Sequence, residues 1–281
     1  IQSLSGHMAI GQNRYATFGG SKEEHAQPVG AENDTVYLAH NGNLPVTEPL
    51  EAFLDSVGIT TKGCNDSELM HRAIKYYVDN GASLESAIEQ AFPLFTGAFS
   101  LLIMTRDKIA SVRDTHGIRP LSLCKLNGGF VVASETCAID VVGGTTLRDV
   151  RPGEMVVFDK KGMHLKQLAP SDQKLDIFEF VYFSRPDSHL LGKSVNEVRK
   201  NLGRELAKEH PIEADIIIPV PDSAVPATLG YAEQAKIPFE LGFVKNRYIG
   251  RTFIMPDQRL RELGVRMKLN TLVEVIKGKR I

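Results

Sequence analysis

The sequence predicts two consecutive domains, a strand-rich α+β domain followed by an α/β domain. Residues 98–158 contain five short β patterns separated by turn signals, including an Asn-Gly-Gly turn. Apolar periodicity lapses at 169–174, which predicts a linker. Beyond it, a buried strand at 214–219 precedes a helix at 224–235, an alternation typical of α/β domains.

Composition narrows the class of protein. The chain has 281 residues, enough for two domains with their own cores, and a net charge of −1. This balance argues against a protein whose main partner is nucleic acid or a membrane surface. The start does not resemble a secretory signal, and no apolar run reaches about 18 residues. Cys64, Cys124 and Cys137 are scattered, which fits a reducing cytoplasm and predicts no metal cluster.

Candidate binding residues begin near the N-terminus. Residues 8–20 read as a short strand entering a Gly-rich loop, where Arg14 is either a surface ion pair or a bidentate carboxylate ligand. A strand at 35–38 precedes Asn41-Gly42, which is either a hairpin turn or an oxyanion hole. We favour the second, because Pro45 interrupts any returning strand and a helix is predicted over residues 48–57.

Asp66 lies just before a helical pattern with Leu69, Ile74 and Val78 near one face. Its carboxylate can cap the helix or lie in the first turn, and it can also bind a cationic ligand group. The helix dipole favours the ionised form in either role.

The second half carries a candidate anion site. Residues 242–256 hold three cations and no acid, and residues 245–268 have a local charge of +5. Such a run is commonly a solvated surface, but its interleaved aromatic residues predict an ordered or gated loop, and they could also stack nucleobases. Ser223 follows a strand and starts a helix, where phosphates are commonly held, although it could simply cap the helix.

Several motifs together resemble the amidophosphoribosyltransferase family, over essentially the whole chain. Residues 8–20 are similar to the Gly-His-x-Arg-Tyr-x-Thr-x-Gly motif of class II glutamine amidotransferases, with Gln12 in place of the usual His. The resemblance implies an N-terminal-nucleophile glutaminase with an αββα sandwich at 1–169, then a type I phosphoribosyltransferase-like α/β domain at 170–281. The other matching segments are 39–44, 114–121, 133–135, 151–154, 178–188 and 242–256.

The resemblance also implies roles for individual residues. It implies glutamine binding by Arg14 and Asp66, and an oxyanion hole formed by the Asn41 side chain and the Gly42 N–H. It further implies a Mg²⁺ contact from Ser223 and a loop that closes over phosphoribosylpyrophosphate (PRPP). The loop residues are Lys245, Arg247, Tyr248 and Arg251.

The implied reaction converts glutamine, PRPP and water to 5-phosphoribosylamine, glutamate and pyrophosphate, the first step of de novo purine synthesis. Purine nucleotides are expected as feedback inhibitors. The protein is expected to form a homodimer or homotetramer in the cytoplasm and to have no nucleic-acid or membrane partner. No iron–sulfur cluster is expected, because Asp176 stands where cluster-bearing members have a cysteine. The alternatives are another class II glutamine amidotransferase, or a non-catalytic regulator or nucleic-acid-binding relative.

Family members begin with a Cys-Gly whose cysteine is the nucleophile, whereas this sequence begins with Ile1. It ends at Ile281, where the family continues into the loop that binds the ribose and 5-phosphate of PRPP. We therefore expect an internal fragment that alone has neither glutaminase nor transferase activity.

Overall fold

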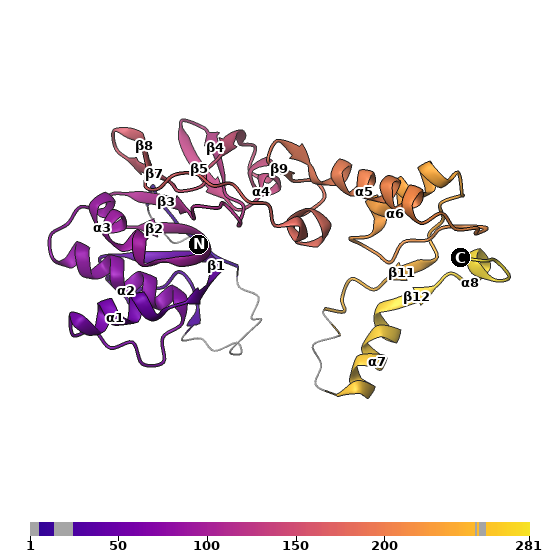
Figure 1. The fold of residues 1–281 in the computed structure, drawn as a ribbon, viewed down its shortest axis with the longest axis horizontal. Helices are drawn as coiled ribbons and strands as arrows, with labels where there is room; N and C mark the ends of the chain where they lie inside the picture. The colour runs from indigo at the N-terminus through magenta and orange to yellow at the C-terminus, as the bar shows by residue number, and fades with distance from the viewer. Residues whose placement is uncertain (1–5, 14–24, 251, 253–256) are drawn as a thin grey trace. The chain divides into compact units, whose positions relative to one another are not determined.

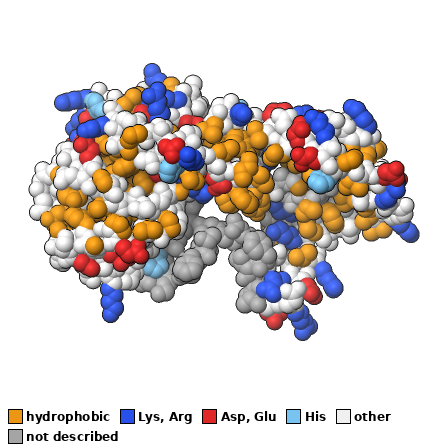
Figure 2. All heavy atoms as spheres, viewed as in Figure 1, with side chains coloured by type: hydrophobic (Ala, Val, Ile, Leu, Met, Phe, Trp, Pro, Cys, Tyr) orange, Lys and Arg blue, Asp and Glu red, His pale blue; other side chains and the backbone are white. Residues whose placement is uncertain are grey.

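The computed structural model describes residues 6–13, 25–250, 252 and 257–281. The chain forms two compact units, residues 1–176 and 177–281, and each is described by itself. Figure 1 traces the elements of both units along the chain. In Figure 2, acidic and basic side chains are interspersed over the visible face, in keeping with the net charge of −1. No helix in the described ranges is long and apolar enough to cross a membrane.

The first unit is built on a five-stranded antiparallel sheet with the order β1-β2-β3-β7-β8. Four of its strands, β1, β2, β3 and β7, bury apolar residues such as Leu38, Leu101 and Val112. The register is continuous along each pair except for an irregularity in β1 between Asn43 and Val46. The strands are β1 (Tyr37–Val46), β2 (Thr96–Met104), β3 (Ile109–Arg113), β7 (Glu154–Asp159) and β8 (Gly162–Gln167).

Three helices cover one face of this sheet, as Figure 1 shows for α1, α2 and α3 beside β1 and β2. Leu69, Met70 and Ile74 of α2 are buried in the same core as the strand residues. Asn65 caps α2, with Glu68 completing a capping box. The helices are α1 (Glu48–Ser56), α2 (Asp66–Asp79) and α3 (Leu84–Ala91), and a 3₁₀ turn follows at Phe92–Leu94.

A second antiparallel sheet of order β5-β4-β6 contains β4 (Ser122–Leu126), β5 (Gly129–Ala133) and β6 (Thr145–Asp149). Leu123 of β4 shares a buried cluster with Val156 of β7, so the two sheets pack together. The short helix α4 (Thr136–Val141) packs against β5 and β6. The order of helices, sheet, sheet and helix is the αββα arrangement predicted for the first domain.

The main difference from the sequence prediction lies in β1. The predicted strand ended before Asn41, but β1 continues to Val46 because β2 supplies its backbone partners. The irregularity between Asn43 and Val46 accommodates Pro45, which has no N–H to donate. Asn41 and Gly42 therefore lie inside a strand, and the prediction that this strand ends at residue 38 was wrong.

The second unit contains two closely packed helices, α5 (Val195–Glu209) and α6 (Val225–Ala235). A Cβ atom added to Gly203 would lie 1.8 Å from the Ala227 carbonyl oxygen, so the backbones touch at this point. Strand β11 (Phe243–Lys245) pairs antiparallel with β12 (Leu269–Thr271). The remaining elements are a π-helical turn (Glu179–Phe183), β9 (His189–Leu190), β10 (Lys193–Ser194), α7 (Gln258–Lys268) and α8 (Val273–Ile276).

Two expectations for this unit need correction. The strand predicted at 214–219 appears in the described chain as one parallel bridge, between Ile217 and Phe239. Val195, Val198, Leu202 and Leu206 recur at helical spacing in the sequence, which predicts one buried face, but in α5 Leu202 and Leu206 are exposed. The face around Gly203 is turned inward instead, because only a residue without a side chain permits this approach to α6.

Candidate active site

The candidate site of the first unit lies along the outer side of β1. The backbone N–H of Leu38 donates to Val29 O at 2.9 Å, and that of His40 donates to the Gln27 side chain at 2.7 Å. Both bonds point away from β2. Because backbone groups alternate between the two sides of a strand, the N–H of Gly42 has the same outward direction.

Contacts of the opposing strand support this direction. Gly42 lies opposite Phe99 of β2. The Phe99 N–H donates to the Asp114 carboxylate at 3.1 Å, and its carbonyl accepts from the Asp114 N–H at 2.9 Å. Both polar backbone groups of Phe99 are therefore turned away from β1. Gly42 is exposed, so its N–H can donate to a ligand at the edge of the sheet.

Only glycine fits at position 42. A Cβ atom there would lie 2.0 Å from the Ala98 carbonyl oxygen and 2.7 Å from His40 Nε2. Its φ of 155° is also one that residues with a side chain rarely adopt. The close approach of the β1 backbone to its paired strand β2 thus explains why residue 42 is glycine, whether or not a turn is present.

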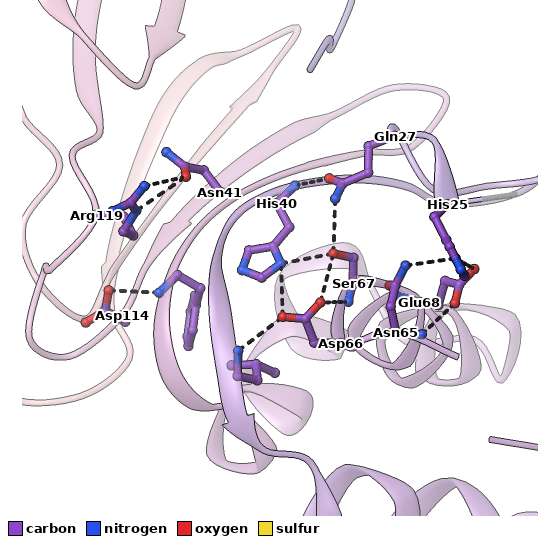
Figure 3. Close-up of polar contacts among 12 residues, drawn as sticks. His25, Gln27, His40, Asn41, Asn65, Asp66, Ser67, Glu68, Asp114 and Arg119 are labelled. Carbon is purple, nitrogen blue, oxygen red and sulfur yellow. Dashed lines mark hydrogen bonds and ion pairs between the residues drawn. The ribbon is translucent and has the colours of Figure 1, made fainter. Parts of the chain in front are cut away.

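Asn41 presents its carboxamide on the sheet face opposite to His40, as alternation along a strand requires. Its Oδ1 accepts from Arg119 Nε at 3.4 Å and from Arg119 Nη2 at 3.3 Å (Figure 3). Its Nδ2 donates to Ser134 Oγ at 3.4 Å. The amide nitrogen and the Gly42 N–H come from consecutive residues at one edge, which is the pairing expected of an oxyanion hole.

Asp66 begins α2 and reaches β1 from the other side (Figure 3). Its Oδ2 accepts from the Leu44 N–H at 3.1 Å, and its Oδ1 accepts from the Ser67 N–H at 2.8 Å. Asn65 is the cap, so of the two structural roles considered for Asp66 the first-turn position is correct. The side chain retains 21% exposure, which leaves the carboxylate accessible to a cationic group.

His40 lies beneath Gly42 and is 4% exposed. Its Nδ1 is 3.0 Å from Ser67 Oγ and 3.8 Å from Asp66 Oδ2 (Figure 3). The pKa of His40 is lowered to about 4, chiefly by burial; the Asp66 carboxylate opposes this shift and the charge of Arg119 adds to it. The ring is therefore neutral at physiological pH.

The second predicted glutamine ligand, Arg14, lies outside the described residues, so its position is not part of this site description. Gln12, which replaces the family's usual histidine, donates from Nε2 to His40 O at 3.5 Å. Its Oε1 is buried, and within the described ranges it contacts no donor. Gln12 thus adjoins the strand that carries Asn41 and Gly42.

In the second unit, the predicted residue Lys245 contacts Asp222, the neighbour of the predicted residue Ser223 in the chain. Ser223 and Asp222 precede α6, and Lys245 at the end of β11 forms an ion pair with Asp222. Ala224 is the N-cap of α6, so the alternative of Ser223 as the cap was wrong. This places a hydroxyl, a carboxylate and an ammonium group near one helix N-terminus.

The other predicted loop residues are solvent-facing or outside the description. Arg247 is exposed and Tyr248 is 97% exposed. Asn246 anchors the turn, since its N–H donates to Lys268 O at 2.7 Å and its Oδ1 accepts from the Tyr248 N–H at 3.0 Å. Arg251 lies outside the described residues.

Sequence reasoning missed four residues of the first site: Gln27, His40, Ser67 and Arg119. Residues 114–121 were matched to the family with no role for Arg119, and residues 25–29 carried no recognised pattern. An arginine held between Gly117 and Pro120 was a usable signal, because a cation fixed in a rigid turn can serve a polar partner.

The cysteines and the acidic residues give no alternative centre. Burial raises the pKa values of the Cys64 and Cys124 thiols, which disfavours the reactive thiolate. In the part of the chain that the structure describes, no three His, Cys, Asp or Glu side chains gather closely enough to hold a metal ion.

Comparison with known proteins gives matches along the whole chain. A family described as a glutamine amidotransferase domain matches residues 12–141. The amidophosphoribosyltransferase of Bacillus subtilis is 43% identical over 285 residues, covering 100% of this chain and 60% of the relative. The amidophosphoribosyltransferase of Archaeoglobus fulgidus is 37% identical, covering 100% and 62%. The chain thus spans about 60% of the length of these two relatives.

Solved structures agree. The B. subtilis glutamine PRPP amidotransferase complexed with ADP and GMP superimposes with a TM-score of 0.84 at 43% identity, covering 95% of this chain and 58% of that one. A structure described as the allosteric regulatory enzyme of purine biosynthesis gives a TM-score of 0.85 at 44% identity, with the same coverage.

Proposed function

Over its whole length the chain is homologous to amidophosphoribosyltransferases, and from this premise we propose that the protein transfers the amide nitrogen of glutamine to PRPP. The products are 5-phosphoribosylamine, glutamate and pyrophosphate. The observation that carries the proposal is strand β1, whose residues 41–44 supply the Asn41 amide, the Gly42 N–H and the Leu44 N–H that holds the Asp66 carboxylate.

In the first unit, Asp66 accepts the α-ammonium of glutamine. Arg14 is assigned the α-carboxylate, because a guanidinium binds a carboxylate with two parallel hydrogen bonds. When the side-chain amide is attacked, its oxygen gains negative charge, and Asn41 Nδ2 and the Gly42 N–H donate to it. Fixed donors aimed at developing charge lower the barrier without reorganising during the reaction.

In the second unit, Ser223, Lys245, Arg247, Tyr248 and Arg251 are assigned to PRPP. Ammonia attacks C1 of the ribose and pyrophosphate leaves, so a cationic loop that covers the site stabilises the leaving group and excludes water. Mg²⁺ would neutralise the pyrophosphate. The Ser223 hydroxyl and Asp222 carboxylate supply oxygen ligands, which suits an ion that takes few protein ligands and completes its shell with phosphate and water.

The B. subtilis relative is described as complexed with ADP and GMP. We assign purine nucleotides to this protein as feedback inhibitors, and a homo-oligomer as its assembled form. The three cysteines are free thiols, which supports a cytoplasmic location.

The test is glutamine-dependent release of pyrophosphate from PRPP by the complete protein with Mg²⁺ present. Release that requires both substrates supports the proposal. Glutamate formation without pyrophosphate would instead indicate another class II amidotransferase, and absence of both products would indicate a non-catalytic relative. Asp66→Asn separates the glutaminase reaction from the transferase reaction, since it should raise the KM for glutamine and leave the synthesis of 5-phosphoribosylamine from added ammonia unchanged.

A further inference from the structure

We propose that Arg119 is a positioning residue that holds the Asn41 carboxamide in the one orientation in which its nitrogen can stabilise the oxyanion. This inference rests on the proposed glutaminase site. It concerns a residue that contacts Asn41 and is assigned no contact with substrate.

The need for such a residue follows from the chemistry of an amide. A carboxamide has a donor end and an acceptor end of nearly the same size. If the Asn41 group turned by 180°, Oδ1 would face the developing negative charge and repel it. The backbone N–H of Gly42 has no such ambiguity, so Asn41 is the donor that requires control.

Of the two described partners of the Asn41 amide, only Arg119 can distinguish its oxygen from its nitrogen and so fix its orientation. A guanidinium group has donors and no acceptor, so both Arg119 nitrogens select Oδ1, at 3.4 and 3.3 Å. Ser134 Oγ, 3.4 Å from Nδ2, can donate or accept and therefore tolerates either orientation. Arg119 also places positive charge beside the amide, which polarises its N–H bonds toward an anion.

The position of Arg119 is itself fixed by a buried arginine. Its backbone carbonyl accepts from Arg113 Nε at 2.9 Å and from Ser100 Oγ at 3.1 Å. Arg113 is 1% exposed, and its other nitrogens donate to Val150 O at 2.7 Å and Gly117 O at 2.8 Å. The turn that carries Arg119 is thus tied to β2, β3 and the segment before β7.

The test is a double-mutant cycle on glutamine hydrolysis by the complete protein. Removing one oxyanion donor lowers kcat about 10²–10³-fold, so Asn41→Ala should do so. Arg119→Ala should lower kcat about 10–100-fold, with little change in the KM for glutamine. In the Asn41→Ala background, where no amide remains to orient, Arg119→Ala should have less than about one-tenth of that effect.

Further variants separate positioning from other roles. Arg119→Lys, which keeps the charge and one donor, should recover part of kcat. Exposed Arg106, in the turn after β2, is the matched control, and Arg106→Ala should change neither parameter. Ammonia-dependent synthesis and the unfolding midpoint of Arg119→Ala should stay near wild type, which excludes a folding defect.

Three results would overturn the inference. The first is an equal effect of Arg119→Ala on kcat in the wild-type and Asn41→Ala backgrounds. The second is a raised KM with unchanged kcat for Arg119→Ala, which would make Arg119 a substrate ligand. The third is a wild-type kcat for Arg119→Ala. Failure of the proposed glutaminase site, on which this inference rests, is distinguishable, because the wild-type protein would then hydrolyse no glutamine at all.

Discussion

The buried imidazole of His40 should stay neutral well below the pH at which ordinary histidines gain a proton. Burial moves its pKa from the usual 6.5 to about 4. Asp66, 3.8 Å from Nδ1, favours the charged form, and Arg119 opposes it. Desolvation decides the outcome, because the ring is 4% exposed and its Nε2 meets no described hydrogen-bond partner.

The pKa shift has a definite consequence for stability. Since the folded pKa is depressed, the stabilisation is complete above pH 6.5 and is lost as the pH falls toward 4, because the unfolded chain then binds more protons. One pKa unit corresponds to about 1.4 kcal/mol, so the free energy of unfolding should fall by about 3 kcal/mol over this interval from His40 alone.

The direct assay is a histidine NMR titration between pH 7.5 and 4.5. The resonance that disappears in His40→Asn identifies His40, and asparagine can keep a hydrogen bond to Ser67. We expect that His40 does not reach its midpoint within this range. A midpoint near 6.5 in a spectrum that otherwise remains native would refute the reasoning. Denaturant unfolding adds a second measure, since the difference between wild type and variant should shrink toward pH 4.

Three further changes test the packing and charge of both units. Gly42→Ala puts a Cβ 2.0 Å from a backbone oxygen of β2. The rate of glutamine hydrolysis should therefore fall at least about 100-fold, and the free energy of unfolding should fall by about 1–3 kcal/mol. A hydrolysis rate near that of the wild type would contradict the close-contact argument. Gly203→Ala puts a Cβ 1.8 Å from a backbone oxygen of α6, so it should lower the free energy of unfolding by about 1–3 kcal/mol. Leu202→Ala, at an exposed position, is the control. Equal denaturation midpoints for Gly203→Ala and the wild-type protein would contradict this argument. Asp222→Asn removes a carboxylate that is 70% exposed and pairs with Lys245, so stability should change by less than about 1 kcal/mol. Calorimetry without Mg²⁺ should then detect tighter pyrophosphate binding, because Lys245 is released from its ion pair; weaker binding under these conditions would contradict the assigned phosphate site.

Local sequence pattern was enough for the elements that carry strong periodicity. The five strands between residues 98 and 158 were predicted because apolar runs and turn residues alternate there. Strand β8 was missed because its side chains are largely exposed and polar, and β6 because three of its five residues are exposed. Neither strand has a period to detect, and both are defined by pairing with a neighbour.

The residues of the candidate site likewise fall into those that a local motif predicts and those that only the folded chain brings together. Asn41, Gly42 and Asp66 could be named from sequence because each lies in a short recognisable motif. Arg119 lies 78 residues from Asn41, and no local pattern reports a hydrogen bond over that separation. His40 stood inside the motif, yet its neutrality depends on burial by α2, which only the packed chain reveals.

The length of β1 explains why these groups can cooperate. Had the strand ended before Asn41, a flexible turn would have carried the two proposed oxyanion donors. Pairing through Asn43 instead fixes alternation across residues 40–42. The His40 side chain is then directed to α2 and Asp66, the Asn41 amide to Arg119 on the opposite face, and the Gly42 N–H to the sheet edge. Three chemically different environments thus meet within three residues, and the register with β2 sets their relative positions.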